Sequence, residues 1–390
     1  MNSRERFLAT MNFEQLDEVP LLEFGYWSGA VRQWYKEGLQ EVVGIPSRDE
    51  WPDGRAIFHN RMMGAFGSPD DYDIMNQLGF DKAPQRVPIN CFLCPAFEER
   101  ILEDLGDRYT WIDQDGAMKL EDKERISMPQ WLSWAVSSRE DWEQVKVERL
   151  RPTLDGRLPQ DWDQKKDEFK GRDYPLIIGD LQGFYGTPRR LLGPEQVLYA
   201  FYDQPGLVQD MINYLCDFWI ALYDQVLDWV NVDAALIWED MCYKSGPLIS
   251  PAMFREFILP AYKRLTAFLR GRGIEHIFVD TDGNCEALIP LFIEGGITGI
   301  FPFEVAAGMD IIKIRESYPR LQMLGGIDKQ KVAKGKRAID RELESKIPFM
   351  LEEGGFVPSI DHTIPPDISW QNFVYYRTRI REMVQAIGQT

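Results

Sequence analysis

Two aspartates lie two residues apart at the end of an apolar run in HIFVDTDGNCE, residues 276–286. Residues i and i+2 of a β-strand point to the same side, so Asp280 and Asp282 should project together. Two carboxylates held this close repel each other, and the pKa of one rises unless a cation or a proton lies between them. The pair therefore predicts a bound metal ion, a bound proton or a substrate ammonium group.

Other acidic side chains also stand at the ends of apolar runs. They are Asp180, Glu239, Asp240, Glu304, Asp328 and Asp361, the last of which is followed by His362. An aspartate at such a place often caps the following helix, and this role stays open for Asp282 and Asp328. Capping does not explain Asp280, which lies inside its run. His362 could simply bond nearby backbone in a turn, but its place after the last run favours function.

One combination of these residues predicts a metal centre. Oxygens of Glu239, Asp280 and Asp282 with a nitrogen of His362 would form a hard, mixed ligand set for zinc or a harder divalent ion with an open coordination position. Such an ion would polarise a substrate oxygen. Without a metal, the same acids could act as proton donor and acceptor. Glu239, Asp280 and His362 are therefore the candidate catalytic residues.

Aromatic and polar side chains near the same run ends predict a substrate pocket. Aromatic residues make up 13% of the chain, so core packing is the default role for any one of them. Together they indicate an apolar pocket, in which an arginine would meet an anionic group. The candidate substrate-binding residues are Tyr26, Trp27, Asp180, Tyr185, Arg189, Trp238, Tyr243 and Asn284.

The elements that would position these residues alternate between strands and helices. Short apolar runs occupy residues 174–180, 233–240, 274–280, 297–303, 321–328 and 355–361, with amphipathic helical patterns such as 193–204, 204–230, 250–273 and 285–296 between them. An early run at 18–24 could be a first strand. Neither a GxGxxG nor a phosphate-loop motif supports a nucleotide-binding fold. The pattern predicts a (β/α)₈ TIM barrel, whose active face is formed by the loops after the strands.

Residues from about 98 to 170 interrupt this alternation. Asp115-Gly116 lies between two strand-like segments and predicts a β-hairpin, and a charged segment follows it. No flexible linker or strong repeat divides the chain. We therefore expect a single barrel domain over residues 1–390, with an elaboration in its first half.

Charge and composition limit the classes of partner. The 390 residues include 62 acidic and 44 basic side chains, a formal charge of -18 that disfavours nucleic acid and anionic membrane surfaces. The N-terminal stretch does not resemble a signal peptide, and no apolar run reaches bilayer length. We expect a cytoplasmic protein that binds small molecules, with homo-oligomerisation left open. Five sparse cysteines are expected to be reduced, and three histidines are too few for a multi-histidine metal site.

Several blocks together resemble the uroporphyrinogen decarboxylase superfamily. They are SRERFLATMNFEQLDEVP at 3–20, SPAMFREFILPAYKRL at 250–265, Gly283-Asn284 after a strand, LGGID at 324–328 and EEGGFVPSIDHTIPPD at 352–367. The likeness covers nearly the whole second half and mainly the start of the first. It implies a (β/α)₈ barrel that is either a decarboxylase of heme biosynthesis or a methyltransferase that acts with corrinoid proteins, coenzyme M or folate.

The resemblance also separates these two branches. True decarboxylases carry the arginine-rich FMRQAGRY, where this chain has LEFGYWSGAVRQWY with Arg32 alone, although His362 matches a histidine of their GHG loop. The zinc methyltransferases carry His-x-Cys-Gly-Asn where this chain has DTDGN at 280–284, and a further cysteine where it has His362. Their three ligand positions thus fall on Asp280, Asp282 and His362, with the soft ligands replaced by hard ones. Hard ligands favour a harder metal ion, and such an ion polarises an ether or hydroxyl oxygen better than it activates a thiol.

The resemblance therefore implies a methyltransferase-like enzyme. It would demethylate a small, methoxylated or aromatic compound toward a separate corrinoid protein, with a metal ion polarising the leaving group. Uroporphyrinogen decarboxylation and a non-catalytic binding barrel remain the alternatives.

Overall fold

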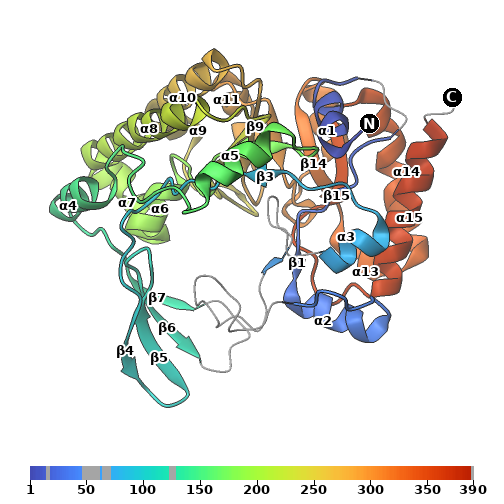
Figure 1. Ribbon diagram of the computed structural model, residues 1–390, viewed down its shortest axis with the longest axis horizontal. Helices are drawn as coiled ribbons and strands as arrows, with labels where there is room; N and C mark the ends of the chain where they lie inside the picture. Colours follow the sequence, from blue (N-terminus) through green and yellow to red (C-terminus); the bar gives the residue numbers. More distant parts are fainter. Residues whose placement is uncertain (15–17, 46–61, 64–71, 123–128, 388–390) are drawn as a thin grey trace.

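The core of the protein is a curled parallel sheet. A computed structural model describes residues 1–14, 18–45, 62–63, 72–122 and 129–387. Seven strands pair in the order β15-β14-β13-β12-β9-β8-β3. Their bounds are β3 Gln85–Arg86, β8 Leu176–Ile178, β9 Ala234–Trp238, β12 His276–Asp280, β13 Gly299–Phe301, β14 Gln322–Ile327 and β15 Phe356–Ile360. Helices surround this sheet, as Figure 1 shows, so the predicted TIM-barrel class is confirmed.

Six of these strands coincide with the six predicted apolar runs, but the first strand does not. Residues 18–24 form no strand because Pro20 has no N–H and the N–H of Leu21 bonds the Asp81 carboxylate at 2.9 Å. On the side of β8 away from β9, the parallel partner is instead β3, a two-residue strand that follows Pro84. One isolated parallel bridge, between Tyr26 and Ile364, joins β1 (Tyr26–Trp27) to the loop after β15.

The helices lie along the outer face of the sheet (Figure 1). Their bounds are α6 Gly186–Leu192, α7 Pro194–Asp203, α8 Pro205–Leu227, α9 Pro251–Met253, α10 Leu259–Gly271, α11 Ile289–Glu294, α12 Ile311–Ser317, α13 Lys329–Ala333, α14 Lys336–Glu353 and α15 Trp370–Ile387. The four predicted helical segments are confirmed, with a π-helical turn at Phe254–Ile258 between α9 and α10 and a 3₁₀ turn at Glu286–Leu288 before α11.

Alternation along the strands separates two cores. Leu236, Phe278, Phe301 and Val357 belong to one buried cluster that fills the barrel interior, and Phe7 of α1 (Ser3–Met11) packs into it with its ring centroid 6.3 Å from that of Phe278. The residues between them along each strand pack instead with the helices. Helix α1 covers the end where the strands begin, and the loops after the strands form the opposite face.

The first half of the chain carries a second, antiparallel sheet. Its strands are β4 Arg100–Asp104, β5 Arg108–Ile112, β6 Met118–Asp122 and β7 Gln130–Ser133, and the sheet projects from the rest of the molecule in Figure 1. The predicted hairpin is confirmed: Ile112 pairs with Met118 around Gly116, whose φ of 79° favours glycine.

Shorter elements complete the first half. They are β1 Tyr26–Trp27, α2 Ser28–Glu37, β2 Met62–Met63, α3 Tyr72–Leu78 and, after the antiparallel sheet, α4 Arg139–Arg149 with α5 Trp162–Lys170. Strands β1 and β2 pair with each other. The single-domain organisation remains a prediction. Among the helices of the described residues, none is long and apolar enough to cross a membrane.

A buried ion pair joins the two ends of the chain. Arg377 of α15 lies 2.5 Å from Glu23, and their side chains are 4% and 1% exposed. The other carboxylate oxygen of Glu23 accepts the N–H of Ile360, the last residue of β15. Burial raises the pKa of Glu23, while Arg377 opposes this rise. Arg377 is therefore the cation that allows the buried Glu23 side chain to stay ionised between the first and last segments of the chain.

Replacing Arg377 with Met should destabilise the protein strongly. The change leaves Glu23 buried without its cation, and we expect the free energy of unfolding to fall by about 3–5 kcal/mol. Urea denaturation measures this loss. The control is Arg337→Met on α14, where the arginine is exposed and a change within about 0.5 kcal/mol is expected. A loss at Arg377 no larger than that of the control would contradict the role of the pair.

Candidate functional site

The mouth of the barrel brings three predicted residues into one region. Asp280 ends β12 with the interior-facing orientation of Phe278 and is partly exposed. The Asp282 side chain is 36% exposed, and its Oδ2 lies 3.2 Å from His362 Nε2. The His362 ring also packs on Phe24, with ring centroids 4.8 Å apart. The loops after β12 and β15, which carry the residues predicted to act together, thus lie side by side.

The electrostatics of these acids favour a bound proton. Burial raises the pKa of Asp280 well above its ordinary value, and the charges of Asp282 and Asp240 raise it further. Burial also raises the pKa of Asp282, while its hydrogen bond to His362 opposes the rise. Asp280 is therefore the carboxyl group of the mouth that is best placed to keep its proton as pH rises.

Asp361 fixes the loop that carries His362. Its side chain is fully buried, and it accepts the N–H of Val305 at 2.9 Å and the N–H of Lys329 at 3.2 Å. These bonds connect the loops that follow β13, β14 and β15. The neighbouring histidine is thereby held beside Asp282.

Glu239, predicted as a catalytic and metal-binding residue, has a structural place instead. It shares the outward orientation of Ile237, and its oxygens accept four hydrogen bonds of 2.7–3.0 Å. The donors are the backbone N–H groups of Phe184, Tyr185 and Gly186 and the hydroxyl of Tyr262. Burial raises its pKa. These bonds fill the acceptor capacity of the carboxylate, so we do not retain Glu239 as a ligand.

Gly183 explains how the loop after β8 reaches this carboxylate. A Cβ at this position would lie 1.8 Å from the carbonyl oxygen of Trp238 and 2.7 Å from Glu239 Oε2. Only glycine permits such a close approach of the loop to β9. The loop and the carboxylate therefore form one rigid support behind the mouth.

The predicted metal centre does not match the arrangement of the side chains. Within the described ranges, no three His, Cys, Asp or Glu side chains are grouped as a metal site. Glu239 is engaged elsewhere, and His362 is bonded to Asp282. The residues therefore do not fit a divalent ion as they are placed here.

The two open capping roles have different outcomes. Asp328 caps α13 by accepting the N–H of Gln330 at 2.8 Å, so capping accounts for it. Asp282 bonds His362 and is not the capping residue of the 3₁₀ turn that follows, which begins after Cys285.

Asn284, a candidate for substrate binding, uses its amide to join two loops, since it accepts from Glu286 N–H and donates to the Ala307 carbonyl.

The remaining substrate-binding candidates fall into two groups. Tyr26 and Tyr185 are fully buried against helix side chains, with Tyr26 packed on Trp34 and Tyr185 stacked on Phe201. They leave no surface for a ligand, so we interpret both as packing residues. Both side chains are buried because of how the strands are aligned and which helices cover them, and a local sequence pattern does not reveal this.

The other candidates surround the mouth. Trp27 is partly exposed and Tyr243 is 69% exposed. Arg189 bonds Asp240 at 2.6 Å and lies over Trp238, 5.0 Å from the ring centroid.

Two further residues at the mouth were not predicted. Arg86 lies 2.5 Å from Asp180, and Phe24 packs on His362. Arg86 had no signal because β3 is too short to form an apolar run. Phe24 ends the apolar run at 18–24 and could have been named from that position.

Replacing Glu239 with Gln tests its structural role. Either orientation of the amide turns an NH₂ group toward backbone N–H donors, which then lose their acceptor. We expect the free energy of unfolding to fall by about 2–3 kcal/mol in guanidinium denaturation. The exposed Glu316 of α12 supplies the control Glu316→Gln, with no measurable change. Unchanged stability in the Glu239 variant would reopen the catalytic role that the sequence suggested.

Comparison with known proteins places the fold in a family. The family model described as uroporphyrinogen decarboxylase (URO-D) matches residues 173–383, a range that holds six of the seven parallel strands and the Asp280, Asp282 and His362 positions. No curated protein matches the sequence. A solved methyltransferase from Methanosarcina mazei has the same fold, with a TM-score of 0.59 and 15% identity over 98% of both chains. The chain belongs to the uroporphyrinogen decarboxylase family.

Proposed function

We propose that this protein is a methyltransferase that demethylates a small methoxylated or aromatic compound and passes the methyl group to a separate corrinoid protein. Family membership supports the proposal, and the structure with the same fold is a methyltransferase. The observation that carries it is the 3.2 Å contact between Asp282 and His362 beside Asp280 at the mouth, where burial also raises the pKa of Asp280. These three residues occupy the positions that resemble the ligand positions of the zinc methyltransferases.

The reaction needs a proton for the oxygen that loses its methyl group. When the O–CH₃ bond breaks, its electron pair stays on oxygen, which takes the proton of Asp280. The reduced corrinoid of the partner supplies the electron pair for the new bond to the methyl group. A carboxyl group whose pKa is raised by burial keeps its proton to higher pH, which suits it to such general acid catalysis. Asp282 and His362 would then return a proton from solvent to Asp280.

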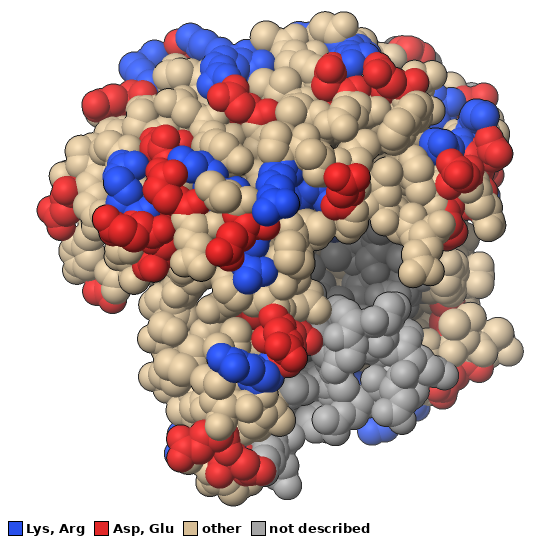
Figure 2. Space-filling view, turned by 60° about the vertical axis from the view of Figure 1, so that its left-hand side comes forward, with Lys and Arg blue, Asp and Glu red and all other residues tan. Residues whose placement is uncertain are grey.

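The charges of the mouth favour an uncharged substrate. Arg86 faces Asp180, Arg189 faces Asp240, and Lys329 lies 3.7 Å from Glu304. These cations are neutralised by the protein and do not form a cluster for a polycarboxylate in the part of the mouth that the structure describes. On the face shown in Figure 2, basic and acidic side chains are similarly intermingled. This balance weighs against uroporphyrinogen as substrate.

The pH dependence of methyl transfer tests the role of Asp280. Only the protonated acid donates, so the rate should fall as pH rises through the raised pKa of Asp280. Asp280→Asn should lower the rate by about 10²–10⁴-fold. Asp282→Asn removes a negative neighbour, lowers the pKa of Asp280 and should move the falling limb of the profile to lower pH. The measurement is loss of a methoxylated aromatic donor in the presence of reduced cobalamin.

Three outcomes would contradict this proposal. Formation of coproporphyrinogen from uroporphyrinogen would restore the decarboxylase alternative. Binding of methoxylated donors without turnover, unaffected by Asp282→Asn, would indicate a non-catalytic barrel. A pH profile that is the same in wild type and Asp282→Asn would show that Asp280 is not the proton donor.

Metal analysis distinguishes a proton from a divalent ion. Asp280, Asp282 and His362 would be the ligands of zinc or a harder ion, which would favour ionised carboxylates and lower the pKa of Asp280. If a proton and not a metal ion lies at Asp280, we expect well below one metal ion per chain even after metal is added. The rate of methyl transfer should then be unchanged by chelators. One metal per chain, lost in Asp280→Asn together with activity, would assign the site to a metal instead.

A further inference from the structure

A cavity lies at the opposite end of the barrel from Asp280. Its volume is 310 Å³, and its lining includes Arg6, Glu18, Val19, Phe80, Arg381 and Val384. Helix α1 places it at the end where the strands begin, because Arg4 of this helix bonds Asp233, the residue before β9. The cavity is therefore formed between the first helix, the segments before β1 and β3, and the last helix.

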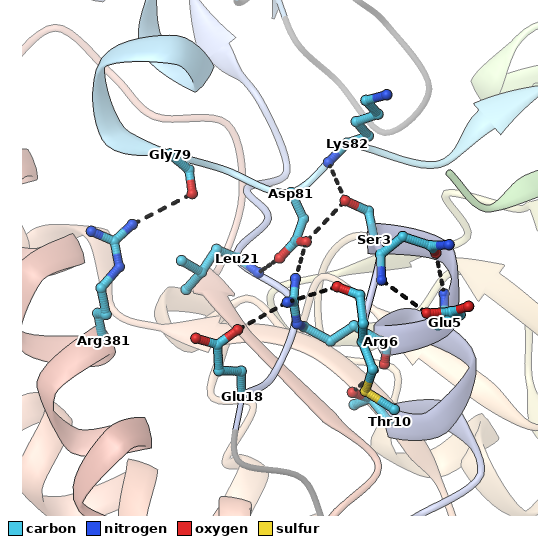
Figure 3. A network of polar contacts seen from close by, with 12 residues as sticks. Ser3, Glu5, Arg6, Thr10, Glu18, Leu21, Gly79, Asp81, Lys82 and Arg381 are labelled. Atoms are coloured by element: carbon cyan, nitrogen blue, oxygen red, sulfur yellow. Dashed lines mark hydrogen bonds and ion pairs between the residues drawn. The ribbon is translucent and has the colours of Figure 1, made fainter. Parts of the chain in front are cut away.

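One wall of the cavity carries an excess of negative charge. Arg6 contacts both Asp81 and Glu18, so a single guanidinium faces two carboxylates (Figure 3). Asp81 is enclosed by its own donors, Ser3 Oγ and Leu21 N–H, each at 2.9 Å. Glu18 uses Oε2 for Arg6 at 2.9 Å, and its side chain is 59% exposed. Glu18 Oε1 is thus the acceptor that this wall offers to a ligand.

The other wall carries an arginine without a carboxylate. Arg381 Nη2 donates to the carbonyls of Leu78 and Gly79 at 2.6 and 3.4 Å. Figure 3 shows Arg381 facing Gly79. In the part of the chain that the structure describes, no acidic side chain forms an ion pair with it. These carbonyl bonds hold one edge of the guanidinium and leave Nη1 and Nε for an anion.

Apolar side chains also contribute to the lining, whose surface is mainly polar. Val19, Phe80 and Val384 line the same cavity as Glu18 and Arg381. Arg377 lies over the Phe80 ring, 4.6 Å from its centroid, and this contact fixes the position of the ring. A cavity of this size holds a molecule at the small end of the range for ligands.

We propose that this cavity binds an α-amino acid with an apolar side chain. The carboxylate meets Arg381, the ammonium group meets Glu18 Oε1, and the side chain packs on Val19, Phe80 and Val384. Such a zwitterion compensates both the excess negative charge around Arg6 and the positive charge of Arg381, whereas a simple carboxylate compensates only one. The ligand joins α1 and the segment after it to α15, and it does so independently of the chemistry at the mouth.

Calorimetric titration of the full chain with L-leucine and L-phenylalanine tests the proposal. At least one of them should bind below about 10 mM and raise the melting temperature. Arg381→Gln and Glu18→Gln should each weaken binding about tenfold or more, because each removes one charged contact. The amide oxygen introduced by Glu18→Gln can still accept from Arg6, so the wall itself is kept. Arg337→Gln is the matched control for Arg381, and Asp280→Asn should leave this binding unchanged.

Two fragments of leucine test the zwitterion directly. 4-Methylpentanoate lacks the ammonium group and 3-methylbutylamine lacks the carboxylate, so each should bind at least tenfold more weakly than leucine. Equal binding of either fragment would overturn the assignment. So would absence of binding by both amino acids, or binding that is unaffected by both cavity variants. None of these results depends on methyl transfer, so failure here is distinct from failure of the proposed function.

Discussion

Alternation along the parallel strands decides what each side chain at the mouth of the barrel can do. Asp280 follows Phe278 on the interior side of β12 and reaches the mouth. Glu239 follows Ile237 on the outer side of β9 and anchors the loop after β8. These two acids at neighbouring strand ends thus have different roles because successive residues of a strand face opposite sides: Asp280 faces the barrel interior and Glu239 faces the helices. Desolvation raises the pKa of both, but only Asp280 is partly exposed, whereas Glu239 is fully buried.

Much of the fold followed from the sequence because the barrel strands are buried on both faces. Such strands appear as continuous apolar runs, and six were recognised in this way. Strand β3 was missed because two residues cannot form a run. The early run at 18–24 predicted a strand because its composition is apolar, but its backbone bonds side chains instead of a neighbouring strand.

The site was predictable where spacing within one strand was sufficient. Asp280 and Asp282 were expected to lie together from their separation of two, and His362 was named from its place after the last apolar run; it lies 3.2 Å from Asp282. The roles of Glu239, Tyr26 and Tyr185 depended on which side of the sheet they face. That depends on register between strands and on helices packed over them, neither of which a local pattern reveals. The opposite orientation of Glu239 is also why the predicted four-ligand set does not assemble.

The Glu23–Arg377 pair has a consequence for synthesis of the chain. Its partners are 354 residues apart, and Glu23 also accepts a hydrogen bond from the backbone N–H of Ile360 in β15. On the ribosome, residue 23 emerges long before residue 377, so the contact between these two segments forms only after residue 377 has been translated. Until then Glu23 must stay hydrated, since burying it without its cation would be costly. The barrel can therefore assemble its middle strands during translation, but it completes its ring afterwards.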